Sequence, residues 1–266
     1  MLESVSDRVA VAEVRPGTYD EVPPVLERVL RSPSSDEEAW RELWHLLATD
    51  GLTVCAASFA ALPYLRDIAR AGESAAVDRA LELAGAIVAG VHQEHGADDL
   101  VRGVAPVIAE LRRMVALCSD SGGLSPASAM ALFRADLAFA GVSGWSLAEY
   151  DFEDGFYTVS CPHCDLPVTV AIGDYGWYSA YRDWGEGDVR RRPLRPFPAD
   201  ELRGLGKRMY DTARALGLAQ MAEGLTCLFG RAECPDCAST FIVADQYAAD
   251  NEPHHSSDGP VPAGGW

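Results

Sequence analysis

Two short stretches decide how the second half of this chain folds: Cys161-Pro162-His163-Cys164 and Cys234-Pro235-Asp236-Cys237. Each stretch sets two thiols at the spacing C-x-x-C, and two such units commonly place four thiolates around one zinc ion. We therefore predict a structural Zn²⁺ site. Its metal ligands are Cys161, Cys164, Cys234 and Cys237.

The residues on both sides of the first thiol pair are mostly β-branched or aromatic, and the second pair is flanked in a similar way. Residues 156–160 and 167–172 enclose the first pair, and residues 231–233 and 239–243 enclose the second. This pattern predicts a strand, a tight turn and a strand at each pair, as in a zinc ribbon. The 69 residues of 165–233 separate the pairs, against about 15–20 in simple ribbons. Because residues 200–229 have helical apolar spacing, we expect a helical insertion there.

Two other functions use similar motifs. Cys-Pro-His-Cys is also the redox motif of thioredoxin-like oxidases, so a thiol–disulfide oxidoreductase using Cys161 and Cys164 is one alternative. That chemistry needs a helix directly after the motif, where the sequence predicts a strand. A zinc-ribbon nucleic-acid binder is the other alternative, with base stacking on the aromatic residues Trp177, Tyr178, Tyr181 and Trp184. Four thiolates leave no position for water, so a catalytic zinc is not expected.

Charge and composition restrict the possible partners and the cellular compartment. The chain has 266 residues, with 40 acidic side chains against 22 basic ones and a formal net charge of −18. This acidic field disfavours nucleic-acid binding. No secretory signal or membrane-length apolar stretch is visible, so we expect a cytoplasmic protein without a membrane partner. In a reducing compartment the seven cysteines are expected to be four ligands and three free thiols: Cys55, Cys118 and Cys227.

The first half, from about residue 20 to 145, shows helical apolar spacing throughout. Three of its segments begin with proline and share a pattern. These prolines, Pro24, Pro63 and Pro106, lie 39 and then 43 residues apart. Helix-pair solenoids repeat at about 40–47 residues, so the spacing predicts a helical repeat.

Residues 42–45, Glu-Leu-Trp-His, and residues 53–65 are similar to the opening repeat of bacterial HEAT-like proteins. The resemblance covers roughly residues 38–145. It implies an interaction protein, such as an immunity or regulatory partner, and it supplies no catalytic residues. His45 lies in the matched segment, and we expect this tryptophan-flanked histidine to be packed.

The sequence thus predicts a mainly α protein in three parts. Residues 1–150 form a HEAT-like helical domain, residues 151–247 a small β zinc-ribbon module with a helical insertion, and residues 248–266 a flexible tail. The expected function is a non-catalytic protein–protein interaction or regulatory module. Its expected partner is another protein of unknown identity.

Overall fold

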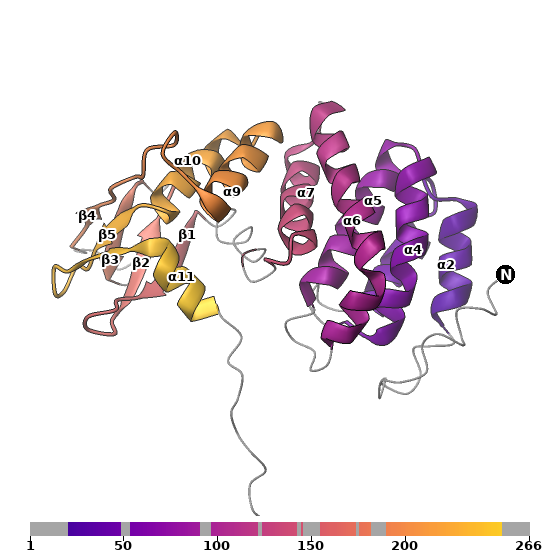
Figure 1. Cartoon of the computed structure of the whole chain (residues 1–266), viewed down its shortest axis with the longest axis horizontal. Coiled ribbons are helices and arrows are strands. Elements are labelled where there is room, and N and C mark those ends of the chain that lie inside the picture. Colours follow the sequence, from indigo (N-terminus) through magenta and orange to yellow (C-terminus); the bar gives the residue numbers. More distant parts are fainter. Residues whose placement is uncertain are drawn as a thin grey trace, which may run out of the picture.

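The structure, a computed structural model, is mainly helical and carries a small antiparallel sheet (Figure 1). It describes residues 21–48, 54–90, 97–121, 124–142, 145, 155–173, 176–181 and 190–251. Residues 252–266, most of the expected tail, lie outside the described residues, as do residues 146–154 around the expected domain boundary.

The first half consists of helices joined by short connections. Their bounds are α2 Val22–Arg31, α3 Glu37–Leu47, α4 Ala56–Ala71, α5 Ser74–Ala89, α6 Ala97–Ser121 and α7 Pro126–Phe139. Local capping explains several starts: the side chain of Asp36 accepts a hydrogen bond from the Ala39 amide at 2.9 Å. Ser125 caps α7 in the same way, and Pro126 occupies the first helical position, where no amide hydrogen is needed.

These helices pack in two rows. α4 packs against α6 in one row and α5 against α7 in the other, while α2 pairs with α3, α4 with α5, and α6 with α7. Pro63 and Pro106 lie inside α4 and α6, the two helices that pack on each other, whereas Pro24 lies in the first turn of α2. The repeating prolines therefore all fall on alternate helices.

The second half is built on two hairpins. Strands β1 (Phe156–Ser160), β2 (Pro167–Ala171), β3 (Tyr178–Tyr181) and β4 (Arg192–Pro193) form one antiparallel sheet in that order. Strands β5 (Arg231–Glu233) and β6 (Thr240–Ile242) form the second hairpin. An antiparallel bridge from Arg195 to Arg231 joins the hairpin to the chain after β4, and the Ser179 hydroxyl donates to the Glu233 carbonyl at 2.8 Å.

The chain between the hairpins is helical where expected, with α9 (Gly204–Ala215) and α10 (Ala219–Leu228). Gly217, at φ +76°, makes the turn between them, a conformation that glycine adopts at little cost. A further helix, α11 (Val243–Asn251), starts directly after β6. Residues 248–251, assigned to the flexible tail from the sequence, therefore belong to a helix.

The two halves touch through α7 and α9. Asp136 of α7 accepts from Arg112 Nε of α6 at 3.2 Å and from Thr212 Oγ1 of α9 at 3.5 Å. Trp145 stacks on Phe229 with ring centroids 5.6 Å apart and lies 5.2 Å from the ring of Tyr247 in α11. One cluster of buried apolar side chains extends through both halves.

No helix among the described residues is both long enough and apolar enough to cross a bilayer.

Candidate metal centre

Each thiol pair lies in the turn of a hairpin, the first between β1 and β2 and the second between β5 and β6. In the first turn the Cys161 amide donates to the Leu166 carbonyl and the Asp165 amide donates to the Cys161 carbonyl, both at 2.9 Å. The same two bonds recur in the second turn, at 2.8 and 3.0 Å. The predicted strand–turn–strand arrangement is therefore present at both pairs, with one turn geometry used twice.

The residue after the second cysteine of each pair has a left-handed backbone. Asp165 and Ala238 both have φ 59°, and they are the non-glycine residues with positive φ among those described. This conformation reverses the chain so that the amide two positions beyond the second cysteine points back at its sulfur. The Leu166 amide hydrogen-bonds the Cys164 sulfur, and the Ser239 amide hydrogen-bonds that of Cys237.

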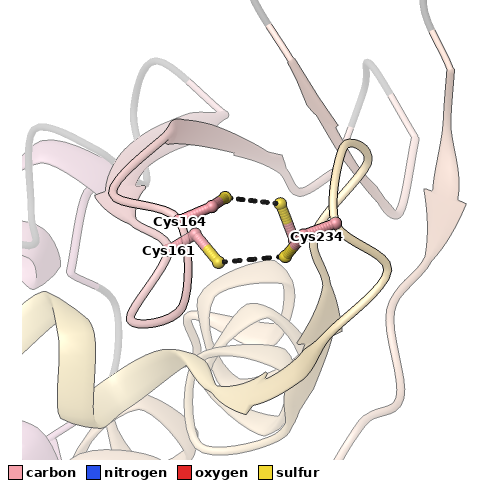
Figure 2. A group of neighbouring side chains, drawn as sticks. Cys161, Cys164 and Cys234 are labelled. Atoms are coloured by element: carbon pink, nitrogen blue, oxygen red, sulfur yellow. Dashed lines mark hydrogen bonds between the residues drawn. The ribbon is translucent and has the colours of Figure 1, made fainter.

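The two turns face each other, and their four sulfur atoms gather in one place (Figure 2). The Sγ atoms of Cys161 and Cys237 are 3.8 Å apart, and those of Cys164 and Cys234 are 3.7 Å apart. All four sulfurs lie within 4.8 Å of one another. A disulfide requires about 2.05 Å between sulfurs, so each of these cysteines is a free thiol.

These distances suit a four-coordinate metal. With zinc–sulfur bonds of about 2.3 Å, the edge of a regular tetrahedron of sulfurs is about 3.8 Å. Two of the separations, 3.7 and 3.8 Å, match that edge. The cluster could therefore hold a metal ion such as zinc.

Burial differs within each pair. The first cysteines, Cys161 and Cys234, are 1% and 0% exposed, whereas the second ones, Cys164 and Cys237, are exposed. The cluster therefore sits at the edge of the β region, with one side against the core and one side toward solvent. Ser160, next to Cys161, donates its amide to Asp250 Oδ2 of α11 at 2.6 Å, which fixes the start of the first turn.

The pKa values of three thiols in the cluster are shifted in different directions: that of Cys237 is lowered, and those of Cys164 and Cys234 are raised. Hydrogen bonds from Ser239 lower the pKa of Cys237 to about 6. The Leu166 amide lowers the pKa of Cys164, but desolvation and the neighbouring thiols outweigh it and raise that pKa to about 12. Desolvation also raises the pKa of Cys234. A bound divalent cation is what would allow several thiolates to coexist here.

The other residues considered from the sequence lie outside this cluster. His163 and Asp236 are exposed on their turns and do not belong to it. Cys227 is buried in α10, where burial raises its pKa to about 11, and Cys55 and Cys118 pack against the core from partly exposed positions. Among the described residues, no other group of metal-ligating side chains comes together.

The aromatic platform that the nucleic-acid alternative would use is only partly described. Tyr178 is buried in β3, Tyr181 is exposed at the end of that strand, and Trp184 lies outside the described residues. The guanidinium of Arg191 lies 4.4 Å from the centre of the Tyr178 ring, and Arg192 pairs with Glu233 at 3.2 Å. Both of these arginines are thus used in contacts within the fold.

Comparison with known protein families, curated proteins and solved structures finds no match to this chain.

Proposed function

We propose that this protein is a non-catalytic interaction module whose second half is held together by a structural Zn²⁺ bound to Cys161, Cys164, Cys234 and Cys237. The observation that carries the metal is the agreement between two sulfur–sulfur separations, 3.7 and 3.8 Å, and the edge of a ZnS₄ tetrahedron. Zinc suits this donor set because thiolate is a soft ligand and four thiolates bind zinc in a tetrahedral shell.

A structural role fits better than a catalytic one. Four thiolates complete the coordination shell, so no position remains for a water or a substrate. The disulfide-oxidase alternative needs the first thiol at a helix N-terminus, where the helix dipole would stabilise its thiolate. In this fold Cys161 is followed by a turn and then by strand β2, so that stabilisation is missing.

The helical half supports an interaction role of the HEAT-like kind. Its helices α4 to α7 pack in two rows, and the pattern-bearing prolines fall on the alternate helices α2, α4 and α6. Stacked helix pairs present long, regular surfaces to other proteins. We propose that another protein is the physiological partner and that the zinc-held half fixes the end of this helical surface at α7.

Metal content tests the proposal directly. Protein purified under reducing conditions should contain one zinc ion per chain by elemental analysis. Cys161→Ser and Cys234→Ser should each lose the metal. Cys227→Ser is the matched control, because Cys227 is equally buried at 1% exposure but lies outside the cluster. It should keep the ion.

The effect on folding should be confined to one half. Structural zinc contributes about 10–16 kcal/mol in zinc-finger peptides, so loss of a ligand should unfold the hairpins while far-UV circular dichroism retains the signal of α2–α7. Wild-type protein without stoichiometric metal, or with the four thiols linked as disulfides, would contradict the proposal. Rapid disulfide reduction that Cys161→Ser abolishes would favour the oxidoreductase instead.

The interaction role needs a separate measurement. Crosslinking in native cells, followed by mass spectrometry, should place the crosslinks of a recurring partner on α2–α7. Crosslinks that fall only between copies of this chain, or no recurring partner at all, would count against an interaction module.

A further inference from the structure

A pocket in the helical half combines features that neither the metal site nor the predicted repeat uses. It has a volume of about 370 Å³ and lies between α3 and α5. We call it the α3–α5 pocket. It is lined by Trp40, Arg41, Trp44, His45, Arg79 and Glu82. Sites for small ligands commonly start at about 300 Å³ and combine aromatic walls with a few polar groups, so its size and lining both fit that class.

Helical spacing explains how the lining is assembled. Trp40 and Trp44 are one turn apart on α3, and each is followed by a polar residue, Arg41 or His45. The sequence led us to expect a packed histidine, but His45 is exposed at the pocket. Its side chain faces out because the positions that α3 buries, such as Leu43 and Leu47, lie on the other side of the helix.

The two tryptophans differ in how firmly they are held. Trp40 is buried, and its indole N–H donates to the Pro33 carbonyl at 2.8 Å, so its ring is fixed. Trp44 is half-buried. The pocket therefore has one rigid aromatic wall and one that remains accessible to a ligand.

The lining of the pocket has more basic than acidic side chains, although the chain as a whole is acidic. Arg79 uses one terminal nitrogen, Nη2, to bind Glu37 at 3.1 Å. Its other terminal nitrogen, Nη1, is buried and has no hydrogen-bond partner among the described residues. Arg41 adds a second, exposed guanidinium. The Arg79 side chain as a whole is 30% exposed, so a rotation of the guanidinium would bring this unpaired nitrogen to an acceptor oxygen in the pocket. A guanidinium favours a carboxylate as that acceptor.

Glu82 is the acidic residue of the lining, and it is half-buried. Burial raises its pKa; Arg134 opposes this effect and Asp78 adds to it. Its neutral form is therefore favoured relative to an exposed glutamate. The polar lining therefore consists of two guanidinium groups, one of them paired with Glu37, together with His45 and Glu82.

We propose that the α3–α5 pocket binds a small aromatic carboxylate. The carboxylate would be held by Arg79 and Arg41, and the ring would lie against the indole of Trp44. Aromatic rings associate with an indole in offset or edge-to-face arrangements, and a guanidinium binds a carboxylate through two parallel hydrogen bonds. This activity goes beyond the metal-held interaction module and does not depend on the sulfur cluster.

Binding can be measured on the full chain by isothermal titration calorimetry and by tryptophan fluorescence. The probes are benzoate and indole-3-carboxylate, with acetate and benzylamine as comparison compounds that lack the ring or reverse the charge. At least one aromatic carboxylate should bind about tenfold or more tightly than either comparison compound, a difference of about 1.4 kcal/mol. No binding by either aromatic carboxylate up to about 10 mM, or equal binding of benzylamine, would overturn the proposal.

Variants then assign the binding to this pocket. Arg79→Gln should weaken the aromatic carboxylate about tenfold, and Trp44→Leu should remove its advantage over acetate. Arg70→Gln is the matched control, because Arg70 also forms a surface ion pair, with Glu110 at 2.6 Å, yet does not line the pocket. Affinity equal to wild type in Arg79→Gln would refute the assignment.

A second variant tests the pocket in case Arg79→Gln does not fold. Arg41 is exposed, so Arg41→Gln should keep the helical circular dichroism signal and still weaken binding. Cys161→Ser should bind the probe as wild type does if its helical half stays folded. Failure of the zinc proposal and failure of this one are therefore separable.

Discussion

Replacing Gly85 by alanine should push apart the two helices that form the centre of the helical half. A Cβ atom added at Gly85 in α5 would lie 2.7 Å from Ala135 Cβ and 2.8 Å from Ala135 Cα in α7. Carbon atoms in contact are normally about 3.5–4.0 Å apart, so the helices would have to separate by about 1 Å. The nearest atoms include backbone, which cannot rotate away.

Two effects of opposite sign decide the outcome. Alanine is favoured over glycine inside a helix by about 1 kcal/mol, whereas overpacking a core costs about 1–3 kcal/mol. Because the obstacle is backbone, we take the upper part of that range. Gly85→Ala should therefore destabilise the protein by about 1–2 kcal/mol, which lowers Tm by about 2–4 °C for a chain of this size.

Thermal and urea unfolding, followed by far-UV circular dichroism, measure this change. Gly103→Ala is the control: Gly103 lies inside α6, and an added Cβ would meet nothing within 4 Å. That variant should gain up to about 1 kcal/mol. Adding Ala135→Gly to Gly85→Ala should restore part of the stability, since one of the two close atoms is removed. If Gly85→Ala were as stabilising as Gly103→Ala, α5 and α7 could not be packed as closely as described.

Three further changes have defined outcomes. Ala238→Gly should stabilise the zinc-loaded protein by up to about 1 kcal/mol and so raise its Tm, because φ 59° strains alanine. A lower Tm would contradict the turn geometry. Burial raises the pKa of Glu82, so wild type loses stability as pH rises from 4.5 through the raised value. Glu82→Gln should remove that loss. Urea unfolding at several pH values measures this, and parallel plots of stability against pH for wild type and variant would contradict it. Trp145→Leu should lose about 1–3 kcal/mol through its ring contacts with Phe229 and Tyr247, and unchanged unfolding would mean that these rings do not join the halves.

Local sequence was sufficient for the elements that carry strong local signals. Residues 156–160 and 231–233 are strands at the predicted positions. Residues 156–160 are mostly β-branched or aromatic, whereas Arg-Ala-Glu at 231–233 pairs with the β-prone residues Thr-Phe-Ile at 240–242. Strand β3, Tyr-Ser-Ala-Tyr, was not predicted, since it has no β-branched residue and is stabilised by pairing with β2. Helix α11 was missed for another reason: it follows Ile242 of β6 without any glycine or proline to mark the change.

The candidate metal site also has a part that the sequence predicts and a part that it does not. The four cysteines could be named from their spacing, but the sulfur contacts could not. The sulfur of Cys161 lies 3.8 Å from that of Cys237, and the sulfur of Cys164 lies 3.7 Å from that of Cys234, because of how the two hairpins face each other. The α3–α5 pocket was not predicted, since Arg79 and Trp44 are 35 positions apart in the sequence and meet only through helix packing.

The sequence separation of the two thiol pairs has a consequence for the unfolded chain. An ion that joins the hairpins closes a loop of 69 residues, 165–233, which includes α9 and α10. For a covalent crosslink, closing a loop of that length removes conformational entropy worth about 4 kcal/mol from the unfolded ensemble. A four-thiolate zinc would act as a similar crosslink, so much of its benefit would reach the distant helices through the restricted unfolded state. Chelation should accordingly make α9 and α10 susceptible to protease before α2–α7.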